Sequence, residues 1–149
     1  MPIREMKEDD LPQVLALQRS LSFQDWNEKQ FAAEIKAGYA LCVVYEEPDK
    51  AGIVGYAVFH LLGPDSELLS IAVDASRQRA GIGATLLEAG SGRLDFDSGD
   101  KLFLEVREGN DKARRFYERH GFTEYSRRGN YYSDGENAIL YVKAKQQGV

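Results

Sequence analysis

Hydrophobic and polar residues follow two different periods along this chain, and the changes of period divide it into strands and helices. Short apolar runs bounded by turn-forming residues predict strands. Apolar positions three and four residues apart, preceded by capping side chains, predict helices. The predicted strands are residues 2–6, Tyr39–Tyr45, Ile53–Leu61, Glu67–Val73, Lys101–Val106, Thr123–Tyr132 and Asn137–Val142. The predicted helices begin at Asp9 or Asp10 and at Asn27, and include Ile82–Gly90 and Asp111–His120.

The ends of the predicted helices carry recognisable signals. Asn27 and Gln30 have the spacing of a capping box. Asn110 and Gly121 bracket the last helix as cap and stop. The order strand-helix-helix-strand-strand-strand-helix-strand-helix-strand-strand predicts an α/β fold, in which a mixed sheet has helices on both faces. We expect the last two strands to form a hairpin across the turn at residues 133–136.

Composition narrows the class of protein. The chain has 149 residues, of which 43% are hydrophobic and 29% charged, so we expect a single folded domain over residues 1–149. Its one cysteine, Cys42, excludes an internal disulfide and is expected to be a buried thiol. The net charge of −5 argues against nucleic-acid binding. The absence of a long apolar run and of a signal peptide predicts a cytoplasmic protein without a membrane segment. A monomer or weak dimer is expected, although the sequence does not determine the oligomeric state.

A glycine-containing loop, RQRAGIGATLL, follows the apolar run LLSIAV. A Walker loop has a lysine directly after its last glycine, but here Ala84 and Thr85 follow Gly83, which excludes that class of phosphate loop. The dinucleotide-binding fingerprint is excluded as well, because Leu86 stands where it has a glycine or alanine. The amides of residues 79–84 would lie at a helix N-terminus, which suits a phosphate or pyrophosphate. Arg77 and Arg79 would add positive charge. The alternative is a turn whose glycines only relieve steric strain.

Two side chains, Glu105 and Tyr117, are candidates for a chemical role. Glu105 lies inside an apolar strand, on the same face as Phe103 and Arg107. It is either a catalytic base or a salt-bridge partner of Arg107, Lys101 or a residue of a neighbouring strand. Tyr117 shares a helix face with other apolar residues, which also suits a core tyrosine. The residues alone leave both pairs of alternatives open.

Several motifs together resemble a known family. IAVDxxxQRxGIGxxLLE, LEVRxxNxxAxxFYExxGF, RRxxYYxxxGExAIL and WNEKQF resemble the GNAT acyltransferase superfamily, and within it the RimI-type branch, bacterial enzymes that acetylate the N-terminus of a ribosomal protein. The resemblance covers nearly the whole chain. It implies a GNAT fold, with a mostly antiparallel sheet of about seven strands, a splayed parallel pair at its middle and about four helices.

The resemblance also implies roles for individual residues. Acetyl-CoA would be the cosubstrate, with no metal. Glu105 would be the general base, and Tyr117 the general acid at the coenzyme sulfur. The expected coenzyme-binding residues are Ile71, Ala72, Val73, Gln78, Arg79, Ala80, Gly81, Ile82, Gly83, Ala84, Thr85, Asn110 and Tyr117. The expected acceptor-binding residues are Trp26, Arg128, Tyr131 and Tyr132, although both tyrosines also suit cross-strand packing.

The implied reaction transfers acetyl to the N-terminal α-amine of a protein, above all the N-terminal alanine of a small-subunit ribosomal protein. Two departures from the branch's pattern fall on the acceptor side, an extra residue in the segment 23–26 and an added Gly129. A small amine, polyamine or lysine side chain therefore remains open as acceptor. An idle acyl-CoA-binding regulatory domain is the third possibility, against which the presence of Glu105 and Tyr117 speaks.

Overall fold

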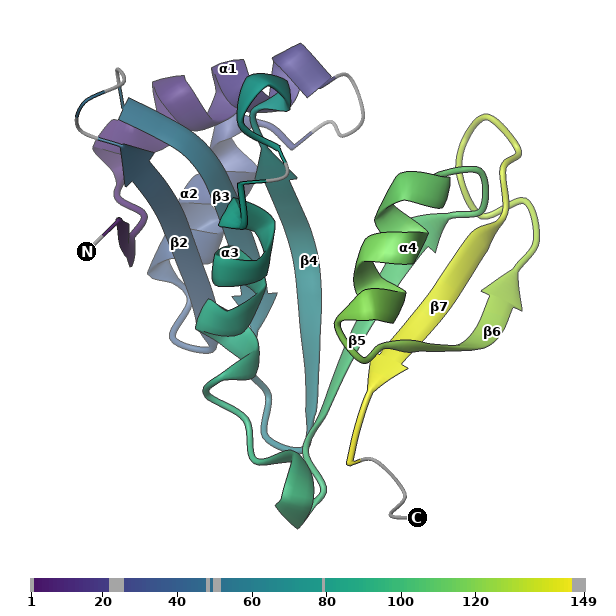
Figure 1. Cartoon of the computed structure of the whole chain (residues 1–149). Coiled ribbons are helices and arrows are strands. Elements are labelled where there is room, and N and C mark those ends of the chain that lie inside the picture. The colour runs from purple at the N-terminus through teal and green to yellow at the C-terminus, as the bar shows by residue number, and fades with distance from the viewer. Residues whose placement is uncertain (1, 22–25, 48, 50–51, 79, 146–149) are drawn as a thin grey trace. The chain divides into compact units, whose positions relative to one another are not determined.

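The computed structural model describes residues 2–21, 26–47, 49, 52–78 and 80–145. Strands and helices follow one another in the predicted order (Figure 1). The strands are β1 (Ile3–Glu5), β2 (Ala40–Glu47), β3 (Gly52–His60), β4 (Asp65–Val73), β5 (Lys101–Arg107), β6 (Thr123–Arg128) and β7 (Ala138–Lys143). The α-helices are α1 (Leu11–Leu21), α2 (Glu28–Lys36), α3 (Ile82–Ser91) and α4 (Asp111–Arg119). None of the helices in the described ranges is long and apolar enough to cross a membrane.

The seven strands form one sheet in the order β1-β2-β3-β4-β5-β7-β6. The pairs β1–β2, β2–β3, β5–β7 and β6–β7 are antiparallel, whereas β4 and β5 are parallel. The parallel ladder joins Asp65–Glu67 to Lys101–Phe103. The predicted fold class, a mixed sheet with one parallel pair and four helices, is confirmed.

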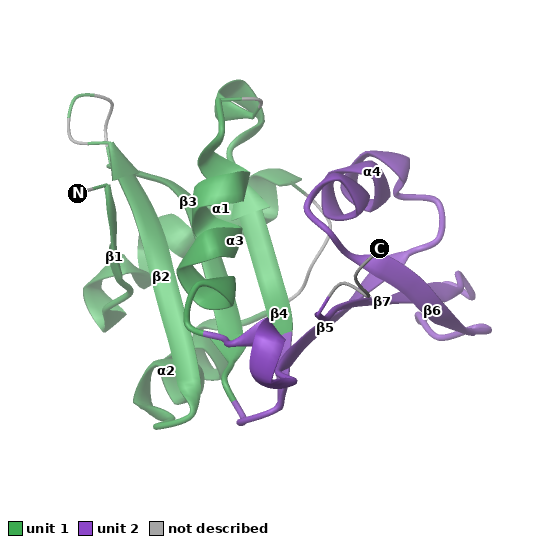
Figure 2. Ribbon diagram, turned by 60° about the horizontal axis from the view of Figure 1, so that its bottom comes forward, with its two compact units in different colours: residues 1–61, 68–93 green, residues 62–67, 94–149 purple. Residues whose placement is uncertain are grey.

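The chain divides into two compact units (Figure 2). The first contains residues 1–61 and 68–93, and the second contains residues 62–67 and 94–149. Each unit has buried side chains of its own.

The first unit buries β3 between helices. All residues from Ile53 to Phe59 are buried, which explains why this strand reads as a continuous apolar run. Phe31 of α2 packs edge-on against the Tyr56 ring, with 5.5 Å between centroids, and the Tyr56 hydroxyl lies 3.0 Å from Ser70 Oγ. Cys42 is buried as expected, and its burial raises the pKa of the thiol to about 11.

Two glycines allow α3 to lie close to β3 in the first unit. A Cβ added to Gly90 would lie 2.2 Å from the Phe59 ring, and one added to Gly55 would lie 2.9 Å from the Leu86 side chain. Real side chains do not approach a rigid ring so closely, so this packing requires glycine at position 90, whereas a Cβ at Gly55 would displace the end of the Leu86 side chain. The helix that follows the glycine loop is thereby fixed on its strand.

The second unit is built on the alternation along β5. Leu102, Leu104 and Val106 are buried, while Phe103, Glu105 and Arg107 are half-buried on the opposite face. Tyr141 of β7 is the register partner of Leu104, so it belongs to the buried face. Helix α4 covers that face, as its residue Tyr117 contacts Tyr141 and Phe122.

The connection between β6 and β7 differs from the predicted tight hairpin. The last residue pair of the ladder is Arg128 with Ala138, so residues 129–137 form a loop and the predicted strand through Tyr132 is wrong. Side chains hold this loop. Arg107 Nη1 donates to Asp134 at 2.9 Å and to Glu136 at 3.0 Å, and Asn130, with φ of 51°, donates its amide to Asn137 Oδ1.

Candidate active site

The loop before α3 leaves backbone donors unused. Gly81 is the N-cap residue with φ of +83°, a conformation that favours glycine, and no side chain caps the helix. The Gly81 carbonyl accepts from the Thr85 amide and hydroxyl. Within the described part of the chain, the amides of Gly81–Ala84 donate to no acceptor. The Gln78 side chain donates to the Val73 carbonyl at 3.1 Å and ties the loop to the end of β4.

Of the two arginines before the glycines, Arg77 differs from the expectation. Arg77 forms a two-bonded ion pair with Glu47 of β2, with distances of 2.8 and 2.5 Å, so its charge is already balanced. Its role in this structure is to fasten the turn after β4 to β2. Arg79 lies outside the described residues.

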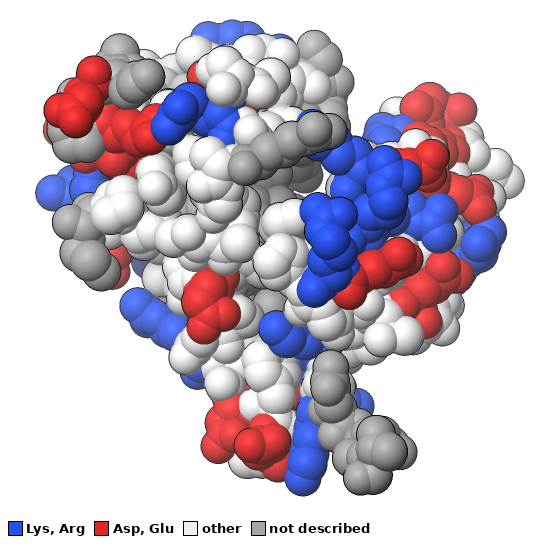
Figure 3. All heavy atoms as spheres, in the orientation of Figure 1, with Lys and Arg blue, Asp and Glu red and all other residues white. Residues whose placement is uncertain are grey.

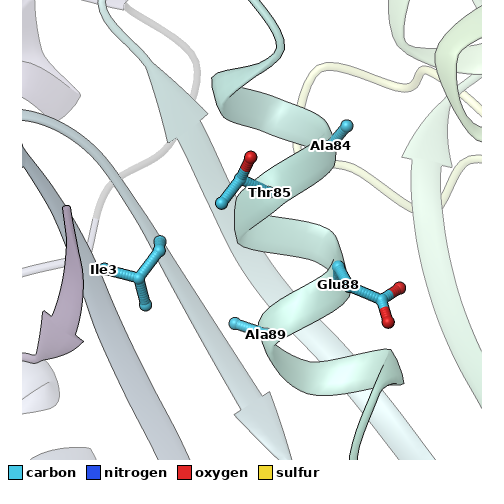
Figure 4. A pocket seen from close by; sticks show the side chains of 5 residues that line it. All are labelled: Ile3, Ala84, Thr85, Glu88 and Ala89. Carbon is cyan, nitrogen blue, oxygen red and sulfur yellow. The ribbon is translucent and has the colours of Figure 1, made fainter. Parts of the chain in front are cut away.

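A pocket of about 410 Å³ lies beside the first turns of α3 (Figure 4). Its lining residues are Ile3 of β1 and Ala84, Thr85, Glu88 and Ala89 of α3. The only charged side chain among them is a carboxylate, which repels anions. This pocket therefore differs in chemistry from the free amides at the start of the same helix.

Glu105 lies at the centre of a group of polar side chains in the second unit. Its side chain is 27% exposed, and Arg128 Nη1 lies 4.0 Å from its Oε1. Tyr131 can donate a hydrogen bond to the same carboxylate, and this contact, with burial, raises the pKa of Tyr131. The predicted residues Glu105, Arg128 and Tyr131 are thus brought together. Arg107, the alternative salt-bridge partner, is engaged by Asp134 and Glu136 instead.

Tyr132 has a different environment from its neighbour. Its ring lies 4.1 Å from the Arg107 guanidinium carbon, measured to the ring centroid, and makes an edge contact with Tyr131 at 5.1 Å. Burial raises the pKa of Tyr132, and the Glu105 charge adds to this effect. Both tyrosines lie in the loop, so the alternative of cross-strand packing is wrong for them, and their acceptor contact stays a prediction. Tyr132 supports the loop, and Tyr131 is 43% exposed beside Glu105.

Two residues that the sequence analysis did not single out join this group. Tyr125 of β6 packs edge-on against Phe103 at 5.7 Å and is half exposed. Burial raises the pKa of Tyr125, Arg128 lowers it, and Glu105 and then Glu67 raise it further. Glu67 also raises the pKa of Tyr131. Glu67 follows Asp65 and Ser66 at the start of β4, so it does not interrupt an apolar run as Glu105 does, and the sequence carried no comparable signal for it.

Tyr117 is almost completely buried, with 7% of the residue exposed. Its ring contacts Phe116, Phe122 and Tyr141, and burial raises the pKa of the phenol. Its hydroxyl makes no hydrogen bond with any residue in the described ranges. Asn110 caps the same helix as predicted, since its Oδ1 accepts from the Ala113 amide at 3.2 Å. Tyr117 is thus a core residue, and its protonated hydroxyl is a hydrogen-bond donor without an acceptor among the described residues.

Glu105 and Tyr117 lie on opposite faces of the sheet in the second unit. Tyr117 belongs to the face covered by α4, while Glu105 shares its face with Phe103. The ladder from β5 to β4 ends at Phe103, two residues before Glu105. Among the described residues, the edge of β5 from Leu104 onward is therefore unpaired on this side.

Trp26 belongs to the first unit. Its ring packs against Phe31 with 5.0 Å between centroids, and its backbone is held by the Gln18 side chain. The neighbouring residues 22–25, where the sequence departs from the branch's pattern, lie outside the described residues. Trp26 is thus part of the rim of the core, and its predicted acceptor contact stays a prediction.

Helix α4 also carries cationic side chains on its surface. Lys and Arg side chains gather over this helix in the space-filling view (Figure 3). Arg114 contacts the Tyr141 hydroxyl, the Glu108 carbonyl and Glu124, so it is engaged in the structure of the unit. The same helix therefore presents an acid candidate on its buried side and positive charge on its exposed side.

Comparisons with known proteins agree with this geometry. A family model for the acetyltransferase (GNAT) family matches residues 4–122. The ribosomal protein bS18-alanine N-acetyltransferase of Escherichia coli (strain K12) is 32% identical over 141 residues, which cover 93% of each chain. The crystal structure of the Escherichia coli enzyme has a TM-score of 0.82 at 31% identity and covers 98% of this chain and 95% of that one. Arabidopsis thaliana NAA60 in complex with acetyl-CoA has the same fold, with a TM-score of 0.79 at 16% identity, over 94% and 96% of the two chains.

Proposed function

The chain belongs to the GNAT acetyltransferase family, and we propose that it transfers acetyl from acetyl-CoA to the N-terminal α-amine of a protein, above all the N-terminal alanine of a small-subunit ribosomal protein. The observation that carries this proposal is the position of Glu105, half-buried at the open edge of β5 among Arg128 and Tyr131. Similarity to the Escherichia coli enzyme supports the choice of acceptor. The family match from residue 4 to 122 spans both compact units, which supports one functional domain over residues 1–149.

The loop before α3 fits the diphosphate of the coenzyme. Its free amides and the positive end of the helix dipole attract an anion, and the glycine at position 81 leaves open space beside them. The expected backbone partners of the pantetheine are Ile71, Ala72 and Val73, although the Val73 carbonyl already accepts from Gln78. Asn110 has its amide group left for the coenzyme after capping α4. The bound coenzyme supplies the acetyl thioester.

Glu105 acts as the general base in this proposal. An α-amine titrates near ~8, so a large share of the acceptor arrives protonated at neutral pH and cannot attack. The Glu105 carboxylate takes that proton and frees the nitrogen lone pair. The new C–N bond then forms as the C–S bond of the thioester breaks.

Tyr117 acts as the general acid. Its raised pKa keeps the phenol protonated at neutral pH, and its hydroxyl is not occupied by another described side chain. It donates its proton to the departing sulfur. Glu105 and Tyr117 thus divide the two proton transfers of the reaction between them.

The first experiment tests the reaction itself. The protein is incubated with acetyl-CoA and short peptides that begin with alanine, and thiol release is followed together with the mass of the peptide. We expect one acetyl group on the free α-amine and none on a peptide with a blocked N-terminus. Acetylation of a lysine side chain or a polyamine, without acetylation of the α-amine, would contradict the proposal.

Glu105→Gln tests the base. We expect kcat to fall about 10²- to 10⁴-fold at neutral pH, which is the usual contribution of a general base. The loss should shrink as the pH rises above ~8, because the amine then loses its proton to solvent. Glu124→Gln, a surface carboxylate on β6 that pairs with Arg114 and Arg127, is the matched control. An unchanged pH–rate profile in the Glu105 variant would refute the assignment of Glu105 as the general base.

Tyr117→Phe tests the acid. We expect kcat to fall about 10²-fold or more, while the melting temperature changes little, since the hydroxyl bonds to no residue of the described part of the chain. Tyr39→Phe, at a position 52% exposed on the first unit, is the control. Full activity of the Tyr117 variant would refute its role as acid.

A further inference from the structure

The turn that joins β5 to α4 leads directly to Asn110. It is closed by the Asn110 amide, which donates to the Arg107 carbonyl at 3.0 Å. Asn110 then caps α4, since its Oδ1 accepts from the Ala113 amide at 3.2 Å. The same helix carries Tyr117. The places of the expected coenzyme-binding residue and of the proposed acid therefore both depend on this turn.

Glu136, in the loop at 129–137, bonds to two residues of this turn at once. Its Oε1 accepts from Arg107 Nη1 at 3.0 Å, and its Oε2 accepts from the Gly109 amide at 2.8 Å. The two bonds need two acceptor oxygens, whereas an amide side chain of the same size has one oxygen and a donor group. Hydrogen bonds to an ionised acceptor are also stronger than neutral ones. One half-buried carboxylate thus fastens the loop to the turn before α4.

Gly109 allows this carboxylate to reach the backbone of the turn. A Cβ added to Gly109 would lie 2.8 Å from Glu136 Oε2, closer than real Cβ atoms come to an oxygen. A larger residue would therefore push the carboxylate away from the amide that donates to it. The contact between Glu136 and the turn requires glycine at position 109.

The same loop carries Tyr131, which lies beside the proposed base. Tyr131 can donate a hydrogen bond to the Glu105 carboxylate. The next residue, Tyr132, donates its amide to the Glu136 carbonyl at 3.1 Å. Glu136 is therefore bonded through its backbone to the part of the loop that holds both tyrosines, and through its side chain to the turn before Asn110.

We propose that Glu136 is a positioning residue, whose carboxylate sets Asn110 on the coenzyme side and Tyr131 on the acceptor side relative to each other. The inference rests on the proposed function, in which Asn110 binds the coenzyme and Tyr131 contacts the acceptor. Glu136 acts through the turn and the loop, without touching either substrate. Because a misplaced group costs catalysis even when it lies away from the chemistry, loss of Glu136 should affect both substrates.

Glu136→Gln removes the charge but keeps the size of the side chain. We expect kcat/KM to fall about ten- to a hundredfold for acetyl-CoA and for the peptide, the size of loss that a displaced group causes. The Kd for coenzyme A, measured by titration calorimetry without any acceptor, should rise by about threefold or more. The comparison is made at a temperature where circular dichroism shows wild type and variant to be folded. A Kd equal to that of wild type overturns the proposal.

The matched control is Asp134→Asn. Asp134 lies in the same loop and pairs with the same Arg107 Nη1, at 2.9 Å, so the variant loses the same charge from the same arginine. Among the described residues, the other hydrogen-bond donor to its carboxylate is the Glu136 amide, not the Gly109 amide. The Kd for coenzyme A should therefore stay at the wild-type value. An equal rise in both variants would assign the effect to net charge or to a loosened loop, and would overturn the proposal.

Gly109→Ala breaks the same contact without any change of charge. It should raise the Kd for coenzyme A as Glu136→Gln does, and it decides the question if the Glu136 variant does not fold. The double variant should bind coenzyme A no more weakly than either single variant, because both remove one interaction. Additive losses, or an unchanged Kd in Gly109→Ala, would count against the proposal.

The role of Glu136 and the proposed function fail separately. If the wild-type enzyme acetylates the α-amine and Glu136→Gln binds coenzyme A as wild type does, the role of Glu136 is wrong and the proposed function stands. If the wild-type enzyme acetylates no peptide with a free α-amine, the proposed function itself is wrong.

Discussion

Asp10 is a nearly buried carboxylate that accepts hydrogen bonds from a guanidinium group and from a backbone amide. The Arg4 guanidinium donates two hydrogen bonds of 2.8 and 2.9 Å, and the Lys7 amide donates a third of 2.8 Å. The hydrogen bonds from Arg4 lower the pKa of Asp10, against the opposing effect of burial. The start of α1 is thereby fastened to β1.

We expect Asp10→Asn to destabilise the protein by about 1.5–3 kcal/mol, the range for hydrogen bonds to charged groups. A carboxylate with a lowered folded-state pKa stabilises the fold above its unfolded pKa of ~3.9, and this contribution is lost as the pH falls through the folded-state value. The difference between wild type and variant in denaturant unfolding should therefore be constant near neutrality and shrink below about pH 4. Exposed Asp9→Asn is the control, and an equal loss there would contradict the assignment.

At the scale of single residues, a residue of the candidate site was predictable where its immediate neighbours in the sequence made it stand out. Glu105 stands out because a charge interrupts an apolar strand, and Asn110 because it precedes a helical pattern. Tyr125 was not predictable in this way, since its position beside Phe103 depends on the register between strands far apart in the chain. The ion pair of Arg77 with Glu47 was missed for the same reason.

At the scale of elements, α3 depends on close contact with β3. Gly90→Ala would place a methyl group 2.2 Å from the Phe59 ring. Alanine favours helix by up to about 1 kcal/mol over glycine, but overpacking costs about 1–3 kcal/mol. We expect a net loss of stability of about 1–2 kcal/mol and a higher KM for acetyl-CoA, because the loop leads into this helix. Thermal unfolding and steady-state kinetics measure the two effects.

Gly38→Ala is the control for this substitution, since nothing lies within 4 Å of an added Cβ there. It should leave both stability and the KM for acetyl-CoA nearly unchanged. A Gly90 variant as stable as wild type would show that α3 has room to shift on its strand.

The elements that were predicted well from the sequence are those whose ends are determined by neighbouring residues. The helices with capping signals, α2 and α4, begin at the predicted residues because Asn27 and Asn110 act locally. The loop at 129–137 was predicted wrongly because its anchors are distant in sequence. Arg107 reaches it from β5, and the Gly109 amide donates to Glu136 at 2.8 Å. Turn-forming residues alone do not report such contacts.

At the scale of the whole molecule, the proposed roles are divided between the two compact units. The loop before α3 and the end of β4, proposed for the coenzyme, belong to the first unit. Glu105, Tyr117 and the loop at 129–137 belong to the second. The fold class followed from the order of strands and helices, which is local information. The division into units did not, because it depends on how contacts are distributed over the folded chain.

The anchoring of the loop at 129–137 bears on how such an enzyme diversifies. Arg107 holds the loop through Asp134 and Glu136, near its far end, while the tyrosine pair lies earlier in it. Substitutions of Tyr131, which is exposed, can therefore accumulate while these ion pairs still hold the segment. With the loop contacting the acceptor as proposed, a lineage descending from this protein can change its amine partner by drift at a few positions, while the machinery that activates the thioester is inherited intact.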